Sequence, residues 1–152
     1  MNATDTAAWI GAVTGIGGLI WNIFVQFRAG GRLDVSVNSG MMRIPDHQKD
    51  ARYVVARVRN VGTAKTTITN MALGKYDSWW ARKRMNRSWA AVAPSPSTAQ
   101  PLPYKLDVGE EWTGMITQTE DLNKLIASDK LWCEIYHSFS SRPVLIHIPP
   151  KP

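Results

Sequence analysis

The pattern of hydrophobic and polar residues divides the chain into two unlike parts. Residues 6–27 carry no charged side chain and form an almost continuous apolar run. Beyond residue 32, apolar and polar residues alternate in short runs, which is the period of a β-strand. The pattern therefore predicts a helical segment over residues 1–28, a linker over residues 29–32 and a β-domain over residues 33–152.

The uncharged run is long enough to cross a lipid bilayer. Residues 7–27 would span about 31 Å as a helix at about 1.5 Å per residue, close to the thickness of a hydrocarbon core. A secretory signal peptide is disfavoured, because Asp5 rather than a base precedes the run and no small-residue cleavage site follows it. Four glycines, a threonine and two amides make the run only moderately hydrophobic, so a buried or re-entrant helix is an alternative. We predict a single-pass transmembrane helix.

Small and amide side chains recur along this helix at steps of four, three, four and four residues. The positions that share this helix face are Gly11, Gly15, Gly18, Asn22 and Gln26. Glycine lets a second helix approach closely, and the amides can hydrogen-bond across the contact. Glycine is also common in membrane helices that make no such contact. We expect this face to bind another membrane helix, from a second copy or from a partner protein.

The charge distribution bears on location and partners. The net charge is +6, and residues 28–152 hold all 18 bases and 11 acids, a net +7. Arg28, Arg32 and Arg43 follow the helix and no base precedes it, which predicts a cell inner membrane protein with its N-terminus outside. The β-domain is then cytoplasmic, with a periplasmic domain as the alternative. A basic domain beside a membrane helix favours contact with the lipid bilayer and its anionic headgroups.

The alternating part predicts a series of short strands. Strands are expected at residues 33–37, 53–60, 66–73, 112–116, 131–137 and 144–148, with a short helix at residues 121–127. Residues 94–103 hold four prolines and are expected to form a surface loop rather than a central strand. Successive strands with few helices indicate an antiparallel sandwich.

Two short motifs in this part resemble those of bacterial Ig-like modules. The sequence VRNVG at 58–62, followed by TIT at 67–69, resembles the V-x-N-x-G strand-turn-strand of many such modules. LDVGEEW at 106–112 is similar to the L-x-x-G-E start of a later strand in them. The overall plan resembles small uncharacterised bacterial or phage proteins with one N-terminal membrane helix and one such domain. The resemblance implies a mainly β, Ig-like antiparallel β-sandwich and transfers no active site, because this fold hosts many functions.

A segment rich in tryptophan and bases is the most unusual part of the β-domain. Residues 75–87 hold five bases and one acid, Asp77. The candidate contact residues are Trp79, Trp80, Arg82, Lys83, Arg84, Arg87 and Trp89. Indoles and cations together suit a lipid headgroup region or another anionic partner. The alternative is a hairpin whose tryptophans pack in the sandwich. Nucleic acid is disfavoured as a partner because no recognition motif accompanies the aromatic residues.

No pattern of catalytic or metal-binding residues stands out. Cys133 is the only cysteine, and the three histidines lack a metal-ligand spacing. We therefore expect no catalytic residue, no metal and no cofactor. The sequence favours a non-enzymatic, membrane-anchored interaction or scaffold module, such as an accessory subunit of a membrane-associated complex. The alternative is a phage, virion or other assembly component whose N-terminal helix packs against protein rather than lipid.

Overall fold

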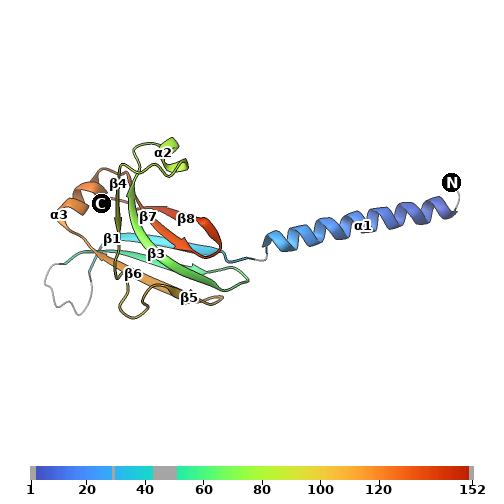
Figure 1. The fold of residues 1–152 in the computed structure, drawn as a ribbon, viewed down its shortest axis with the longest axis horizontal. Helices are drawn as coiled ribbons and strands as arrows, with labels where there is room; N and C mark the ends of the chain where they lie inside the picture. The colour runs from blue at the N-terminus through green and yellow to red at the C-terminus, as the bar shows by residue number, and fades with distance from the viewer. Residues whose placement is uncertain (1–2, 29, 43–50, 151–152) are drawn as a thin grey trace.

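The computed structural model describes residues 3–28, 30–42 and 51–150, and within the first helix it describes the side chains of Trp9 and residues 11–25. It shows a long helix projecting from a two-sheet body (Figure 1). The helices are α1 (Ala3–Arg28), α2 (Trp79–Lys83) and α3 (Glu120–Ala127). The strands are β1 (Leu33–Met41), β2 (Tyr53–Asn60), β3 (Thr66–Lys75), β4 (Trp89–Val92), β5 (Tyr104–Leu106), β6 (Glu111–Thr117), β7 (Leu131–His137) and β8 (Ser140–His147).

The strands form two antiparallel sheets. One has the order β1-β2-β6, and the other has the order β4-β3-β7-β8, with β5 also paired to β3. The prediction of a mainly β protein with antiparallel strands is confirmed, and the two sheets are consistent with a β-sandwich. All six predicted strands and the predicted helix at 121–127 are present; β2 and β7 have the predicted bounds, and the other elements have shifted ends.

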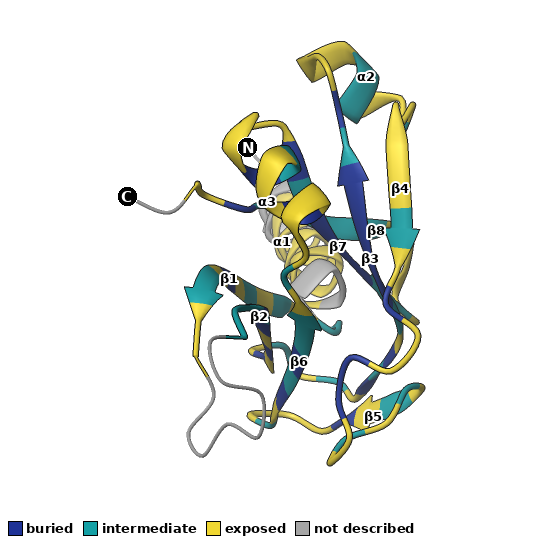
Figure 2. Ribbon diagram, turned by 90° about the vertical axis from the view of Figure 1, so that its left-hand side faces the viewer, coloured by how far each residue is buried: buried dark blue, intermediate teal, exposed yellow. Residues whose placement is uncertain are grey.

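The core lies between the sheets and follows the alternation in the sequence. In β2, Val54, Ala56 and Val58 are fully buried, and the intervening Arg57 and Arg59 are exposed. Strands β3 and β7 carry much of the remaining buried surface (Figure 2). Trp112 of β6 is the largest fully buried side chain, and its indole Nε1 donates a hydrogen bond to the carbonyl of Gln100. That bond ties the predicted surface loop at residues 94–103 to the core.

Helix α1 confirms the predicted helix, but the transmembrane assignment is not supported. Among the residues that the structure describes, no helix is both long and apolar enough to count as a membrane span. Glycines, Thr14 and Asn22 dilute the apolar side chains of α1. Every described side chain of α1 is exposed, including Trp9, Leu19 and Trp21 (Figure 2).

The segment after α1 is attached to the body by backbone hydrogen bonds. The Arg32 carbonyl accepts from the amides of Val61 and Gly62 at 2.8 and 3.1 Å, and the Gly30 carbonyl accepts from Thr63 at 3.1 Å. Residue 29 of the predicted linker lies outside the described residues. Residues 30–32 of the predicted linker are therefore held against the β-body by hydrogen bonds.

Gly62 is required for this attachment, and Gly62→Ala is expected to lower the free energy of unfolding by about 1–3 kcal/mol, as overpacking does. A Cβ at Gly62 would lie 2.2 Å from the Gly30 carbonyl oxygen and 2.3 Å from the Arg32 nitrogen, so the backbone must move. Urea denaturation followed by circular dichroism measures the change. Gly30→Ala is the matched control, because an added Cβ there has no heavy atom within 4 Å. Equal effects of the two substitutions would contradict this account.

Candidate functional surfaces

Helix α1 carries two different faces. Gly11, Gly15, Gly18 and Asn22 fall on one side of the helix because they are spaced by three or four residues. An added Cβ at any of the three glycines meets no heavy atom within 4 Å, so among the described residues nothing packs against these three positions. The side chain of Gln26, the fifth predicted contact, lies outside the described residues. Most of the other described positions of α1 carry bulky apolar side chains, which are exposed.

The tryptophan and base-rich segment forms a short helix in the connection between β3 and β4. Ser78 caps α2, because its hydroxyl accepts a hydrogen bond from the Ala81 amide at 3.1 Å. The helix ends in a Schellman arrangement, in which Met85 adopts a positive φ of 56° and its amide bonds to the Arg82 carbonyl. The chain then returns as β4, which pairs with the end of β3.

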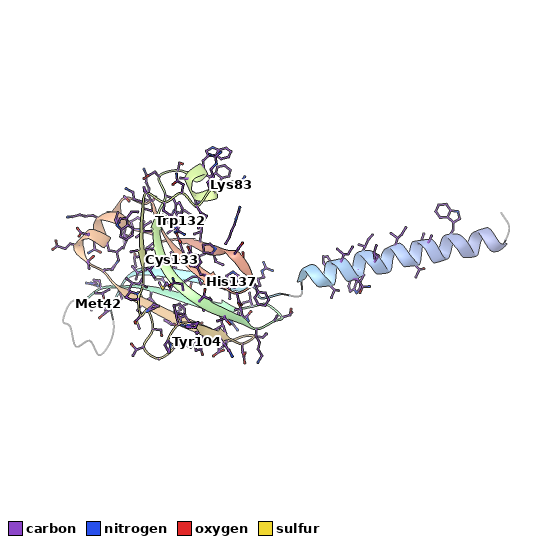
Figure 3. The ribbon with its side chains drawn as sticks, viewed as in Figure 1. Met42, Lys83, Tyr104, Trp132, Cys133 and His137 are labelled. Carbon is purple, nitrogen blue, oxygen red and sulfur yellow. The ribbon has the colours of Figure 1, made fainter. Side chains whose placement is uncertain are left out.

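The two tryptophans of α2 lie outside the core. Trp79 and Trp80 are 53% and 62% exposed, and their rings contact edge to face with centroids 4.7 Å apart. The alternative of a hairpin with these tryptophans packed in the sandwich is therefore wrong, although the hairpin itself is present. Trp89, on β4, is also exposed. We call the exposed residues of α2 and Trp89 the α2 surface; it lies at one end of the body (Figure 3).

Cations accompany these rings. The Nζ atom of Lys83 lies 5.2 Å from the centroid of Trp79 and 5.8 Å from that of Trp80. The Arg82 guanidinium lies 4.1 Å from the ring centroid of Trp132, which comes from β7. Such cation–π contacts hold the charges near the aromatic faces. Arg84, the helix cap, is exposed.

Arg87 differs from the other predicted contact residues because it points toward the body. Its Nε donates to Oε1 of Glu134 at 2.8 Å, and one of its terminal nitrogens pairs with Oε2 at 2.8 Å. Glu134 is fully buried in β7. The prediction of Arg87 as a surface contact stays a prediction, and the structure adds that its charge neutralises a buried carboxylate.

Two tyrosines complete the environment of Glu134. The Tyr76 hydroxyl donates to Oε1 at 2.7 Å and the Tyr136 hydroxyl donates to Oε2 at 2.8 Å. Burial, and then the hydrogen bond to Glu134, raises the pKa of Tyr76 to about 12. A Cβ at Gly74 would lie 2.2 Å from Oε1, so glycine at that position lets the carboxylate approach β3. This cluster joins β3, β7 and the segment after α2, and so fixes the base of the α2 surface.

Sequence reasoning missed Glu134, Tyr76, Tyr136 and Trp132 as parts of this surface. An acid within the apolar strand LWCEIY was the available signal, since a buried carboxylate requires hydrogen-bonding partners. Tyr136 is two residues away, but Arg87 and Tyr76 lie 47 and 58 residues away along the chain, so these two partners could not be identified locally. In the described part of the chain, no group of three or more histidine, cysteine or acidic residues is placed to hold a metal ion.

Comparisons with known proteins add no family to this description. No protein-family model, no curated protein and no solved structure matches this chain significantly.

The protein is expected to lose stability at alkaline pH, because Cys133 and Tyr76 are buried and titrate there. Burial raises the pKa of Cys133 from 9.0 to about 12, and that of Tyr76 rises from 10.0 to about 12. Because the folded protein holds these protons more tightly than the unfolded chain, their contribution is complete below about pH 9. It is lost as the pH rises from 9 to 12, with a slope of about 1.4 kcal/mol per pH unit for each proton.

Urea denaturation at successive pH values measures this slope. Cys133→Ala is expected to show a shallower fall above pH 9 than the unmodified chain. An unfolding free energy that rises between pH 9 and 11, or an equal slope in the variant, would contradict the assignment.

Proposed function

We propose that this chain is a non-enzymatic assembly module in which α1 packs against α1 of a second copy. The observation that carries the proposal is the exposure of apolar side chains around the described helix, including Trp9, Val13, Ile16, Leu19, Ile20 and Trp21. A helix that is hydrophobic on all sides is stable where something covers it. Helix α1 projects away from the two sheets (Figure 1) and is not covered by them.

The glycine face supports a helix as the covering partner. Gly11, Gly15 and Gly18 leave the backbone open to close approach, and Asn22 follows on the same face. A second copy presents the same small-residue face, so two helices can pack through a self-complementary contact. The hydrogen-bonded attachment at residues 30–32 then joins each helix directly to its β-body.

The order of the strands supports an Ig-like body for this module. Apart from β5, which also pairs with β3, the orders β1-β2-β6 and β4-β3-β7-β8 parallel the A-B-E and C′-C-F-G orders of Ig-like sandwiches. We infer that the body belongs to this architecture, which commonly presents contact surfaces on its loops and strand ends. The exposed α2 connection, between the strands equivalent to C and C′, is such a surface.

A lipid bilayer is the second candidate for what covers α1. The absence of charge from residue 6 to residue 27 favours it. In that case the bases that follow the helix orient the N-terminus outside and the body in the cytoplasm. In either environment the proposed role is assembly rather than catalysis.

Fractionation of the full chain tests the proposal. If α1 is covered by protein, the chain is extracted from membranes by alkaline carbonate and sediments as a discrete oligomer without detergent. Carbonate-resistant membrane association, with a single copy per particle after mild detergent extraction, would overturn the self-association proposal and support a lipid anchor. Reporters fused to both termini would then measure the orientation.

A further inference from the structure

A hollow of about 250 Å³ lies between α2 and β8. Its walls come from α2, the loop that follows it and the first half of β8. The lining residues are Trp79, Arg82, Lys83, Met85, Arg142, Pro143 and Leu145. Figure 3 shows Lys83 at the α2 end of the body, above Trp132 of the neighbouring strand. The hollow is smaller than the roughly 300–1,000 Å³ of most drug-sized ligand sites, so it fits a small group or one end of a larger molecule.

The charges around the hollow have one sign. Arg82, Lys83 and Arg142 line it, and no carboxylate does. Among the described residues, no carboxylate forms an ion pair with any of these three cations, whereas Arg87 is paired to Glu134. Three cations around one hollow, with no acid in its walls, favour a bound anion, because an anion in the hollow lowers the repulsion between them.

The types of cation indicate which anion fits. Two guanidinium groups offer paired N–H donors whose geometry matches the oxygens of a phosphate, and the ammonium of Lys83 adds a compact charge. A phosphate monoester has three terminal oxygens and nearly two negative charges at pH 7, so it can use donors from all three side chains. A carboxylate has two oxygens and one charge and would use fewer of them.

The remaining wall is apolar and suits the organic part of an ester. Trp79, Met85, Pro143 and Leu145 line the hollow together with the cations. Trp79 is half exposed, so its ring is accessible for stacking on a flat ligand. The position of α2 is also fixed, because Tyr76 before it and Arg87 after it both hydrogen-bond to Glu134.

We propose that the hollow between α2 and β8 binds the phosphate group of a monoester, with Arg82, Lys83 and Arg142 holding the phosphate and Trp79 contacting the organic part. The phosphate comes from a small soluble ester or from a lipid headgroup, since both present the same chemistry. Arg82 also stacks on Trp132, so replacing Arg82 would disturb packing as well as phosphate binding. Lys83 and Arg142 are exposed, and Lys83 also lies over the rings of Trp79 and Trp80.

Calorimetric titration of the full chain in a nonionic detergent tests the site, with inorganic phosphate and phenyl phosphate as probes. Phenyl phosphate is expected to bind more tightly than inorganic phosphate, because only the ester reaches Trp79. Lys83→Gln and Arg142→Gln are each expected to weaken phenyl phosphate binding at least tenfold. Arg57→Gln, on the exposed side of β2, is the matched control and is expected to bind as the unmodified chain does.

Vesicles distinguish the two sources of phosphate. A lipid headgroup is identified if the chain binds phosphatidylcholine vesicles that contain phosphatidic acid but not vesicles of phosphatidylcholine alone. This binding must be lost in Arg142→Gln, and it identifies the headgroup even if phenyl phosphate binds weakly. The proposal is overturned if neither probe nor vesicle binding depends on Lys83 and Arg142. It is also overturned if a single-stranded oligonucleotide lacking terminal phosphate binds tightly and displaces phenyl phosphate, because the surface would then recognise nucleic acid.

Discussion

Replacing Arg87 with methionine is expected to lower the free energy of unfolding by about 3 kcal/mol. Removing one partner of a buried ion pair costs about 3–5 kcal/mol, because the other charge stays buried without compensation. Glu134 is fully buried, but the Arg87 side chain is 32% exposed and two tyrosine hydroxyls still donate to the carboxylate. These features place the expected loss at the lower end of the range.

Equilibrium urea denaturation at pH 7 measures this loss, and a double variant identifies its cause. Arg87→Met combined with Glu134→Gln is expected to be more stable than Arg87→Met alone, since the amide carries no charge to desolvate. Arg57→Met is the matched control, because Arg57 is exposed and its replacement is expected to change stability by less than about 0.5 kcal/mol. A double variant that is no more stable than Arg87→Met would show that packing of the arginine stem, rather than charge, dominates.

The same substitution connects the core to the α2 surface. Arg87 and Tyr76 hold the two ends of the segment that carries Trp79 and Trp80. When the arginine is lost, α2 is expected to become mobile before the sheets unfold. Hydrogen exchange measures this directly, as faster exchange of the Ala81 and Arg82 amides with unchanged exchange in β7.

Replacing Gly11 and Gly15 together with leucine is expected to weaken self-association of the full chain by more than tenfold. Leucine side chains on this face would keep two helix backbones apart and remove their close packing. Within a single chain the substitution has no steric cost, because an added Cβ at either glycine meets no heavy atom within 4 Å. Any change in association therefore arises at the contact between chains.

Sedimentation equilibrium, or energy transfer between labelled chains, gives the association constant. The matched pair of single substitutions is Gly15→Leu as the test and Gly17→Leu as the control. Gly17 is as open as Gly15 but lies on another side of α1. The control is expected to associate within about twofold of the unmodified chain. If Gly15→Leu and Gly17→Leu associate equally well, the glycine face is not the contact. If both bind membranes more strongly and stay monomeric, lipid covers α1.

Much of the architecture follows from local features of the sequence. The uncharged run predicts α1, and period-two alternation predicts β2, where Val54, Ala56 and Val58 are buried. Helix α3 follows from a periodic run of apolar residues, and Thr119 caps it by accepting from the Leu122 amide. These elements are predictable because the information that specifies each of them lies within a few residues.

Other elements were not predictable from local pattern. Strands β4 and β5 span four and three residues, too few for a clear period, and they exist because each pairs with β3. Helix α2 was not predicted either, because it is one turn long and rests on the Ser78 cap and the turn at Met85. Short elements of this kind depend on the strands that flank them.

The sequence by itself determined that the chain has an apolar N-terminal helix, a mainly β body and a segment dense in tryptophan and bases. Only the tertiary structure decided which of those bases pairs with a buried carboxylate and which of them line the hollow. It turned Arg87 inward to a buried carboxylate and brought Arg142 from β8 to the hollow beside Arg82 and Lys83. The physical reason is that helix and strand periods are local, whereas the environment of a charge depends on residues that folding brings together from distant parts of the chain.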